Sequence, residues 1–232
     1  MPGQDKNQPF IFPKWANYAL PVIVVTVLGA GLYLPTVVTF GFSPKTTDVG
    51  YQPIQPAPFS HAMHAGQLGM DCRYCHNTVE NAPFAAVPAT QTCMNCHTNI
   101  QKPNFEGRPS PGLTPVYESW TSGKPIPWVK VHDLPDYAYF NHAAHVSKGV
   151  GCVTCHGRVD QMERVFQSKP LSMSWCLDCH REPEKVLRPR SEVTNMAYSL
   201  PPAEQLKVGN ELKQQYGIRD VNYMTACSTC HR

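Results

Sequence analysis

The sequence has few charged residues and almost no imbalance between them. Asp, Glu, Lys and Arg make up 16% of the 232 residues, and the formal net charge is +3 with histidine neutral. This excludes the strongly basic footprint of a nucleic-acid-binding protein. Long apolar runs are also few, whereas Pro (23) and Gly (15) are frequent. We therefore expect a mostly α and irregular fold, with short helices joined by loops instead of sheets.

No cysteine lies outside one recurring pattern. All ten cysteines fall in five Cys-x-x-Cys-His pentads, at residues 72–76, 93–97, 152–156, 176–180 and 227–231. In this motif the two thiols become thioethers on the vinyl groups of a c-type haem, and the adjacent imidazole becomes the proximal iron ligand. The sequence therefore predicts five haems c, which would be attached through Cys72, Cys75, Cys93, Cys96, Cys152, Cys155, Cys176, Cys179, Cys227 and Cys230, with His76, His97, His156, His180 and His231 as proximal ligands.

Three other uses of Cys-x-x-Cys pairs fit this pattern less well. A tetrahedral zinc site needs two such pairs, or one pair with two histidines, and five pairs is an odd number. Disulfide bonds do not require a histidine after each pair. A thioredoxin-like redox pair needs a single motif within alternating strands and helices, a pattern that this sequence lacks.

One long uncharged stretch stands near the N-terminus. No charged residue occurs at positions 15–44, a length that exceeds the ~20 residues needed to cross a bilayer. The stretch is too long for the apolar part of a cleaved signal peptide, and no Ala-x-Ala site follows it. We therefore expect an uncleaved, single-pass transmembrane anchor at residues 15–44. Lys6 and Lys14 favour a cytoplasmic position for the preceding tail, residues 1–14.

Two copies of one pattern organise the rest of the chain, residues 45–232, which we expect to form an outer haem domain. Phe-x-His-x-x-His begins at Phe59 and again at Phe140, and two pentads follow each copy. This internal repeat predicts two tandem dihaem modules, at about residues 59–97 and 140–180.

Two further segments complete the expected haem domain. Residues 98–131 are rich in proline and should form an extended connector between the modules. Residues 181–232 form a C-terminal segment, with a helix expected at about residues 203–216 and the fifth pentad at its end. A proline pair before that helix and Gly217 after it fit the usual start and stop signals.

The histidines outside the pentads equal in number the irons that need a sixth ligand. Two histidines three residues apart on a helix share a face and can reach two different haems. Met173, three residues before Cys176, is the alternative ligand if one haem is His/Met ligated, and a thioether would raise the potential of that haem. The predicted distal ligands are His61, His64, His132, His142 and His145. His132 is the least patterned of these, because it lies outside both repeats.

Phe-x-His-x-x-His ahead of Cys-x-x-Cys-His resembles the class III multihaem cytochromes c. The resemblance implies that the first histidine of each pair serves the next haem in sequence. His61 would then ligate the haem of the first pentad, and His142 the haem of the third. It leaves open which of the remaining three haems receive His64, His132 and His145.

A closer similarity involves residues 131–142, residues 170–176 and the single N-terminal anchor. These features are similar to the pentahaem cytochrome subunit of alternative complex III, a bacterial membrane quinol:electron-acceptor oxidoreductase. The similarity implies a non-catalytic redox subunit of the respiratory chain in the bacterial inner (cytoplasmic) membrane, with its haem domain in the periplasm. It also implies polytopic membrane subunits, an iron-sulfur subunit and a monohaem cytochrome c as partners, and a periplasmic electron carrier or a terminal oxidase as acceptor.

Two other function classes remain open at this point. A multihaem enzyme, such as a nitrite reductase, needs one haem with an open distal side, which an altered proximal motif often marks; no pentad here is altered. A membrane-anchored multihaem quinol dehydrogenase also has one anchor, but the fifth pentad and the duplicated modules argue against it. Because six-coordinate irons leave no position for a substrate, the favoured function is relay of electrons from a quinol that partner subunits oxidise.

Haem counting tests the motif interpretation. Pyridine haemochrome analysis of fully matured protein should give five covalently bound haems per chain, because each pentad supplies two thiols and a proximal imidazole. A count of four or fewer haems would contradict the interpretation of the five pentads as haem-attachment motifs. Replacing His231 should alter only the last haem, since its pentad lies outside both repeats.

Overall fold

The computed structural model describes residues 12–41, 47–100 and 110–231. Contacts divide the chain into two compact units, residues 1–46 and residues 47–232. Some predictions therefore fall in part outside the described residues. They concern residues 1–11 of the expected cytoplasmic tail, residues 42–44 of the expected anchor, residues 45–46 and Arg232 at the two ends of the expected haem domain, and residues 101–109 of the expected connector.

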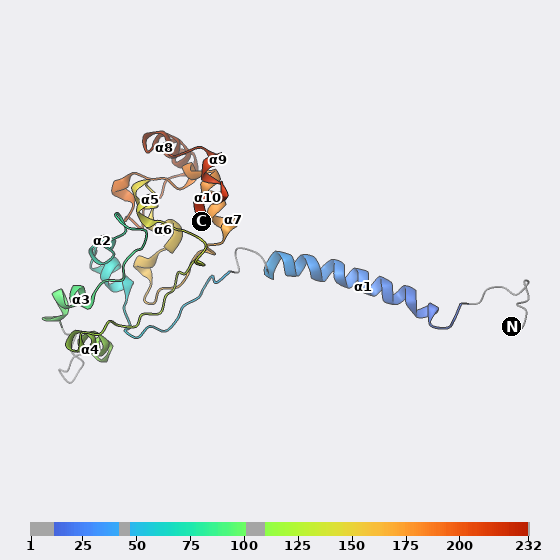
Figure 1. The fold of residues 1–232 in the computed structure, drawn as a ribbon, viewed down its shortest axis with the longest axis horizontal. Helices are drawn as coiled ribbons and strands as arrows, with labels where there is room; N and C mark the ends of the chain where they lie inside the picture. Colours follow the sequence, from blue (N-terminus) through green and yellow to red (C-terminus); the bar gives the residue numbers. More distant parts are fainter. Residues whose placement is uncertain (1–11, 42–46, 101–109, 232) are drawn as a thin grey trace, which may run out of the picture. The chain divides into compact units, whose positions relative to one another are not determined.

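The first unit is built on one long apolar helix, α1 (Ala16–Thr36), which continues into a π-helical turn at Val37–Gly41 (Figure 1). By length and composition this segment is able to cross a membrane, with a mean hydropathy of 2.1 over its most apolar window. None of its residues is buried within the protein. A helix that is apolar on all sides and uncovered by protein suits a lipid environment. The expected N-terminal apolar helix is confirmed.

The second unit consists of short helices and irregular segments (Figure 1). Among the described residues there is no β-strand, only an isolated antiparallel bridge between Val150 and Leu187. The expected mostly α and irregular fold is therefore confirmed. The α-helices of this unit are α2 (Cys72–Cys75), α3 (Thr90–His97), α4 (Thr114–Ser122), α5 (His142–Ser147), α6 (Cys152–His156), α7 (Met173–Arg181), α8 (Pro202–Gln215), α9 (Val221–Met224) and α10 (Cys227–Cys230). A π-helical turn at Ala62–Gln67 and 3₁₀ turns at Pro111–Leu113, Val159–Gln161, Pro183–Lys185 and Arg190–Glu192 complete the set.

Polar side chains fix where several of these short helices begin. Asp71 accepts a hydrogen bond from the backbone N–H of Arg73 at the start of α2, and Ser172 does the same for Trp175 in α7. Such caps satisfy N–H groups that have no partner inside the helix. Because α2 and α7 each carry a pentad, the caps also fix where the paired thiols lie.

The segment between the two repeats differs from the expected extended connector. Its described part contains α4, which follows directly on the 3₁₀ turn Pro111–Leu113. Pro115 lies in the first turn of α4, where a missing N–H costs nothing, and Gly123 ends the helix in the left-handed region at φ 70°. Two of the prolines that suggested an extended chain, Pro111 and Pro115, therefore mark the start of a helical segment.

The apolar core of the second unit is small. One cluster comprises Ala57, Met94, Val116 and Ile126, where α3 meets α4. The other comprises Leu187, Leu212 and Tyr216, where α8 packs against the chain just after the fourth pentad. Only nine apolar side chains of the described residues are buried, far fewer than an ordinary domain of this size needs. Porphyrin faces would supply the missing apolar surface.

Helix α8 contains a glycine whose replacement tests its packing. Ala usually stabilises a helix interior relative to Gly by roughly 1 kcal/mol. A Cβ at Gly209 would instead collide with the backbone carbonyl of Glu184. Gly209→Ala should therefore lower the free energy of unfolding by about 1–3 kcal/mol, measured by thermal unfolding of the haem-loaded protein. Lys207→Ala, an exposed change in the same helix, should leave stability unchanged or slightly raised; equal stability of both variants would contradict this packing.

Candidate haem-binding sites

Each pentad forms a short helical turn in the structure. Residues 72–75 and 227–230 are α2 and α10, and the other three pentads lie in α3, α6 and α7. Two cysteines three positions apart on a turn present their thiols on one side, with the histidine directly beside them. All ten cysteines are free thiols, so none is engaged in a disulfide bond. The thiol pairs are thus in place for two thioether bonds at each pentad.

Backbone carbonyl groups fix the tautomer of four proximal imidazoles. A carbonyl oxygen only accepts hydrogen bonds, so the ring Nδ1 that contacts it must carry the proton. Nε2 then keeps its lone pair, which is the arrangement of a metal-bound histidine. The Nδ1–O distances are 2.9 Å from His76 to Ala86, 2.7 Å from His97 to Ile100, 2.8 Å from His180 to Met224 and 3.0 Å from His231 to Tyr137.

The two Phe-x-His-x-x-His copies have nearly the same geometry. Phe59 meets the ring of His61 edge-on at 4.8 Å and stacks on His64 at 4.3 Å, measured between ring centroids. Phe140 meets His142 edge-on at 4.7 Å and stacks on His145 at 4.4 Å. One phenyl ring thus holds two imidazoles in different planes. The sequence showed that Phe59 and Phe140 recur, but not that they orient the histidines.

Carbonyl groups also fix the tautomer of three predicted distal histidines. Nδ1 of His64 lies 2.8 Å from the carbonyl oxygen of Ser60, and Nδ1 of His145 lies 2.8 Å from that of Asn141. Both contacts join a residue to the one four positions earlier. Nδ1 of His142 is 2.9 Å from the carbonyl oxygen of Pro83, in the other repeat. In all three cases Nε2 is left for a metal.

Three distal histidines face proximal histidines at one common spacing. Ring centroids are 6.2 Å apart for His64 and His97, 6.4 Å for His142 and His156, and 6.2 Å for His145 and His180. Imidazole nitrogens bind metals at about 2 Å, so two rings on opposite sides of one metal have centres about 6 Å apart. These pairs therefore fit an iron between them. They place His142 at the third pentad, the recipient that the class III resemblance implies.

His61 lies at the first pentad, among other imidazoles. Burial, followed by the charges of the neighbouring His76 and His64, lowers the pKa of His61 to about 4. Its buried Nδ1 has no hydrogen-bond partner among the described residues. Burial also lowers the pKa of His156 to about 3, with further contributions led by His132 and His142. Both rings are thus held neutral near pH 7, the form that binds a metal.

His132 is placed differently from the other four distal candidates. Its ring centroid is only 4.4 Å from that of His156, and the rings meet edge-on. In the part of the chain that the structure describes, its buried Nε2 has no hydrogen-bond partner. Burial lowers the pKa of the His132 ring. The ring beside His231 is instead Tyr137, at 5.9 Å. The structure therefore brings His132 to the third pentad and not to the fifth.

Met173, the alternative distal ligand, is the first residue of α7 and is 61% exposed. Its helix carries the fourth pentad, whose His180 is already faced by His145. This arrangement favours the imidazole over the thioether at that pentad.

The spin state of the haems tests the distal positions. His145→Ala should convert about one haem in five from low to high spin in the oxidised protein, because it removes the imidazole that faces His180. Electron paramagnetic resonance measures the high-spin fraction. Ser147→Ala, in the same helix, should leave the spectrum unchanged. A fully low-spin spectrum of His145→Ala would rule out His145 as a ligand.

Comparisons with known proteins agree with this site. Residues 42–110 match the class III cytochrome c family, and residues 138–232 match the family of cytochrome c7 and related cytochromes c. Over 102 residues the chain is 36% identical to the menaquinone reductase multihaem cytochrome c subunit of Nitratidesulfovibrio vulgaris. That match covers 44% of this chain and 45% of the relative, so it spans less than half of the relative's length. Both matched regions carry the thiol pairs and imidazoles described above, so these two regions are similar to the electron-transporting multihaem cytochromes c of the class III and c7 families.

Proposed function

We propose that this chain is the electron-relay subunit of a membrane quinone oxidoreductase and carries five haems c. The observation that supports this most directly is the common spacing of 6.2 to 6.4 Å in the three facing imidazole pairs. A haem iron held by both imidazoles of such a pair would leave no position for a substrate, and it would supply one-electron chemistry.

The residues of the chain have separate roles in this proposal. Bound haem supplies a one-electron iron couple. The thiols of the pentads would tether the porphyrin, and the proximal imidazoles would ligate the iron. Backbone carbonyl groups hold the proton on Nδ1, which keeps each ring in the ligating orientation. The Phe59 and Phe140 rings fix the planes of the distal pairs, and neutral, buried imidazoles require no proton loss before they bind.

Two observations support a membrane setting for this relay. The apolar α1 segment is long enough to span a bilayer, and none of its residues is buried in the part of the chain that the structure describes. The similar protein from Nitratidesulfovibrio vulgaris is described as a menaquinone reductase subunit. We infer that α1 anchors the chain in the inner membrane. Its N-terminal tail would be cytoplasmic, and residues 45–232 would form the periplasmic haem domain.

The partners follow from the size of a quinone site. A single helix cannot enclose a quinone ring, because small molecules bind in clefts lined from several sides. The quinol pocket should therefore belong mainly to a polytopic partner subunit. The finer assignment is to the pentahaem subunit of alternative complex III, with an iron-sulfur subunit and a monohaem cytochrome c as further partners. A periplasmic electron carrier or a terminal oxidase would then receive the electrons.

One observation favours a second candidate, an enzyme with an open haem. Among the described residues, no imidazole faces His231 at the spacing seen in the three pairs, and its ring neighbour is Tyr137. If the fifth haem keeps an open side, carbon monoxide or cyanide should bind the native protein at one haem per chain. A fully low-spin protein that binds neither ligand would leave the relay as the sole function.

Quinol oxidation separates a relay from a quinol dehydrogenase. The haem-loaded 232-residue chain in detergent should be reduced by dithionite, yet it should not oxidise a menaquinol analogue, because a single membrane helix cannot enclose a quinone ring. The complex purified with its membrane partners should oxidise the same quinol. Denatured complex provides the background rate. Efficient oxidation by the isolated chain would move catalysis into this subunit.

A further inference from the structure

The two His-x-x-His segments each join neighbouring pentads. In the first repeat, His61 lies by His76 and His64 faces His97, so the first and second pentads share one segment. The hydroxyl of Tyr74 also accepts a hydrogen bond of 3.1 Å from the Asn95 amide, which ties α2 to α3. These contacts make the first and second pentads direct neighbours.

The second repeat repeats this arrangement. His142 faces His156 of the third pentad, and His145 faces His180 of the fourth. Both distal residues lie on the six-residue helix α5. The third and fourth pentads are therefore neighbours in the same way.

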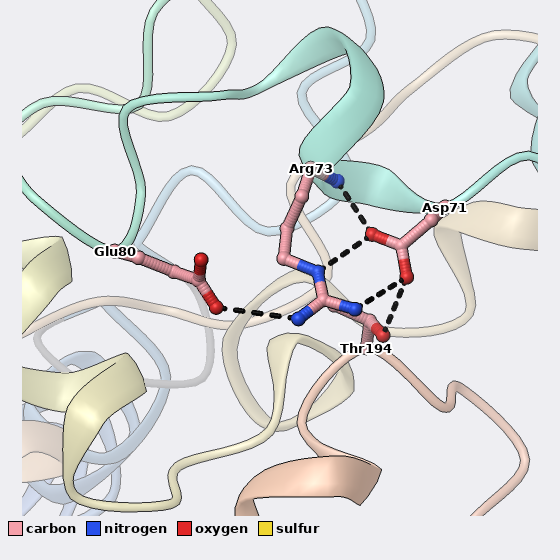
Figure 2. Close-up of polar contacts among 4 residues, drawn as sticks. All are labelled: Asp71, Arg73, Glu80 and Thr194. Carbon is pink, nitrogen blue, oxygen red and sulfur yellow. Dashed lines mark hydrogen bonds and ion pairs between the residues drawn. The ribbon is translucent and has the colours of Figure 1, made fainter.

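The two repeats meet through the first and third pentads. The backbone N–H of Cys152 donates to the carbonyl of Val193 at 3.0 Å, and the next residue, Thr194, donates from its hydroxyl to Asp71 at 3.1 Å. Asp71 directly precedes Cys72, and Figure 2 shows it held between Thr194 and Arg73. The Cys152 thiol is also the main reason that the pKa of the Cys72 thiol is lowered to about 7, which indicates that the two thiols are neighbours.

The charged group around Asp71 holds this junction in place. Arg73 of the first pentad binds both oxygens of Asp71, at 2.8 and 2.9 Å, and reaches Glu80 at 3.3 Å (Figure 2). Hydrogen bonds from Arg73 are the main reason that the pKa of Asp71 is lowered to about 2. Asp71 is thus ionised at any ordinary pH, and it accepts from Thr194 throughout.

The fifth pentad is attached to the fourth. Nδ1 of His180 donates to the carbonyl of Met224 at 2.8 Å, and Met224 ends α9, three residues before Cys227. Helices α7 and α9 are in contact, and Cys176 lies close enough to Cys230 for their charges to interact. Figure 1 shows the corresponding arrangement: α3 lies at one end of the second unit, α2 and α6 lie between, and α7, α9 and α10 lie at the other end.

Exposure of the thiols distinguishes the two ends from the middle. Cys96 of the second pentad and Cys227 of the fifth are exposed, whereas the other eight cysteines are partly buried. In the contacts described above, the second pentad adjoins the first pentad, and the fifth pentad adjoins the fourth. Each of these two pentads thus has one pentad neighbour and one face toward solvent.

We propose that the five attachment pentads stand in single file in the order second, first, third, fourth, fifth, and that redox partners reach the protein at the exposed Cys96 and Cys227 ends. This order rests on the proposed five-haem relay and differs from the order along the chain, in which the second pentad would adjoin the third. The spatial order differs from the chain order because the two repeats meet through the first and third pentads.

The spatial order is tested by proton NMR of the reduced, diamagnetic full-length chain in detergent, with each haem assigned through its own thioether bonds. Nuclear Overhauser contacts are expected between the haem substituents attached at Cys72 and at Cys152. Contacts between the haems of the second and third pentads, with none between the first and third, would overturn the order. A protein with fewer than five haems would instead contradict the proposed function.

The exposed ends are tested by reduction kinetics with dithionite, whose reducing species is an anion. Asn95→Asp and Ser228→Asp each add one negative charge within a terminal pentad, at an exposed position. At low ionic strength the double variant should be reduced about threefold more slowly than the native chain, because like charges repel over this range. Each single variant should lose less than twofold, since the other end stays accessible.

Thr154→Asp is the matched control, because it adds the same charge to the central, third pentad. Its rate should equal that of the native protein, and high salt should abolish the effect in the double variant. Equal slowing by the control and the double variant, or an unchanged rate in the double variant, would overturn the assignment of the two ends. The NMR measurement on the native chain decides the order even if a variant fails to mature.

Discussion

In the proposed function, the rest of the structure depends on one constraint, the covalent attachment of each haem within a span of five residues. Two thiols three positions apart and the next imidazole fix a porphyrin to one short helical turn. The position of each turn in the fold therefore fixes the position of a redox centre. This explains why polar caps such as Asp71 and Ser172 matter beyond helix stability. They determine where the paired thiols begin.

The rest of the second unit acts mainly to orient imidazoles. Carbonyl groups of loops and neighbouring turns bind Nδ1 of seven histidines, so the same contact satisfies the backbone and fixes the tautomer. Only nine apolar side chains of the described residues are buried, as expected if the chain is arranged around flat haems and not around its own side chains. Stability and cofactor binding are therefore closely linked in this protein.

The apolar α1 helix follows a different rule. None of its residues is buried among the described residues, so burial of its apolar side chains would come from lipid or from other subunits. A chain that combines such a segment with closely spaced redox centres suits a relay fixed beside membrane partners. An anchored subunit stays next to the site that supplies its electrons, so electron transfer does not depend on diffusion of the subunit to that site.

The sequence by itself determined the chemistry of the sites, because the five pentads, the two Phe-x-His-x-x-His copies and the uncharged N-terminal stretch are local patterns that a bound haem or a bilayer requires directly. It also predicted the mostly helical fold, and a helix close to the observed α8. Only the tertiary structure decided which distant residues face each other. Contacts between residues far apart in the chain, such as Thr194 with Asp71 and His132 with His156, leave no local signal. These contacts nevertheless join the two repeats through the first and third pentads, and they place His132 at the third pentad. The physical reason is that packing between segments is set by their combined shapes and hydrogen bonds, not by spacing along the chain.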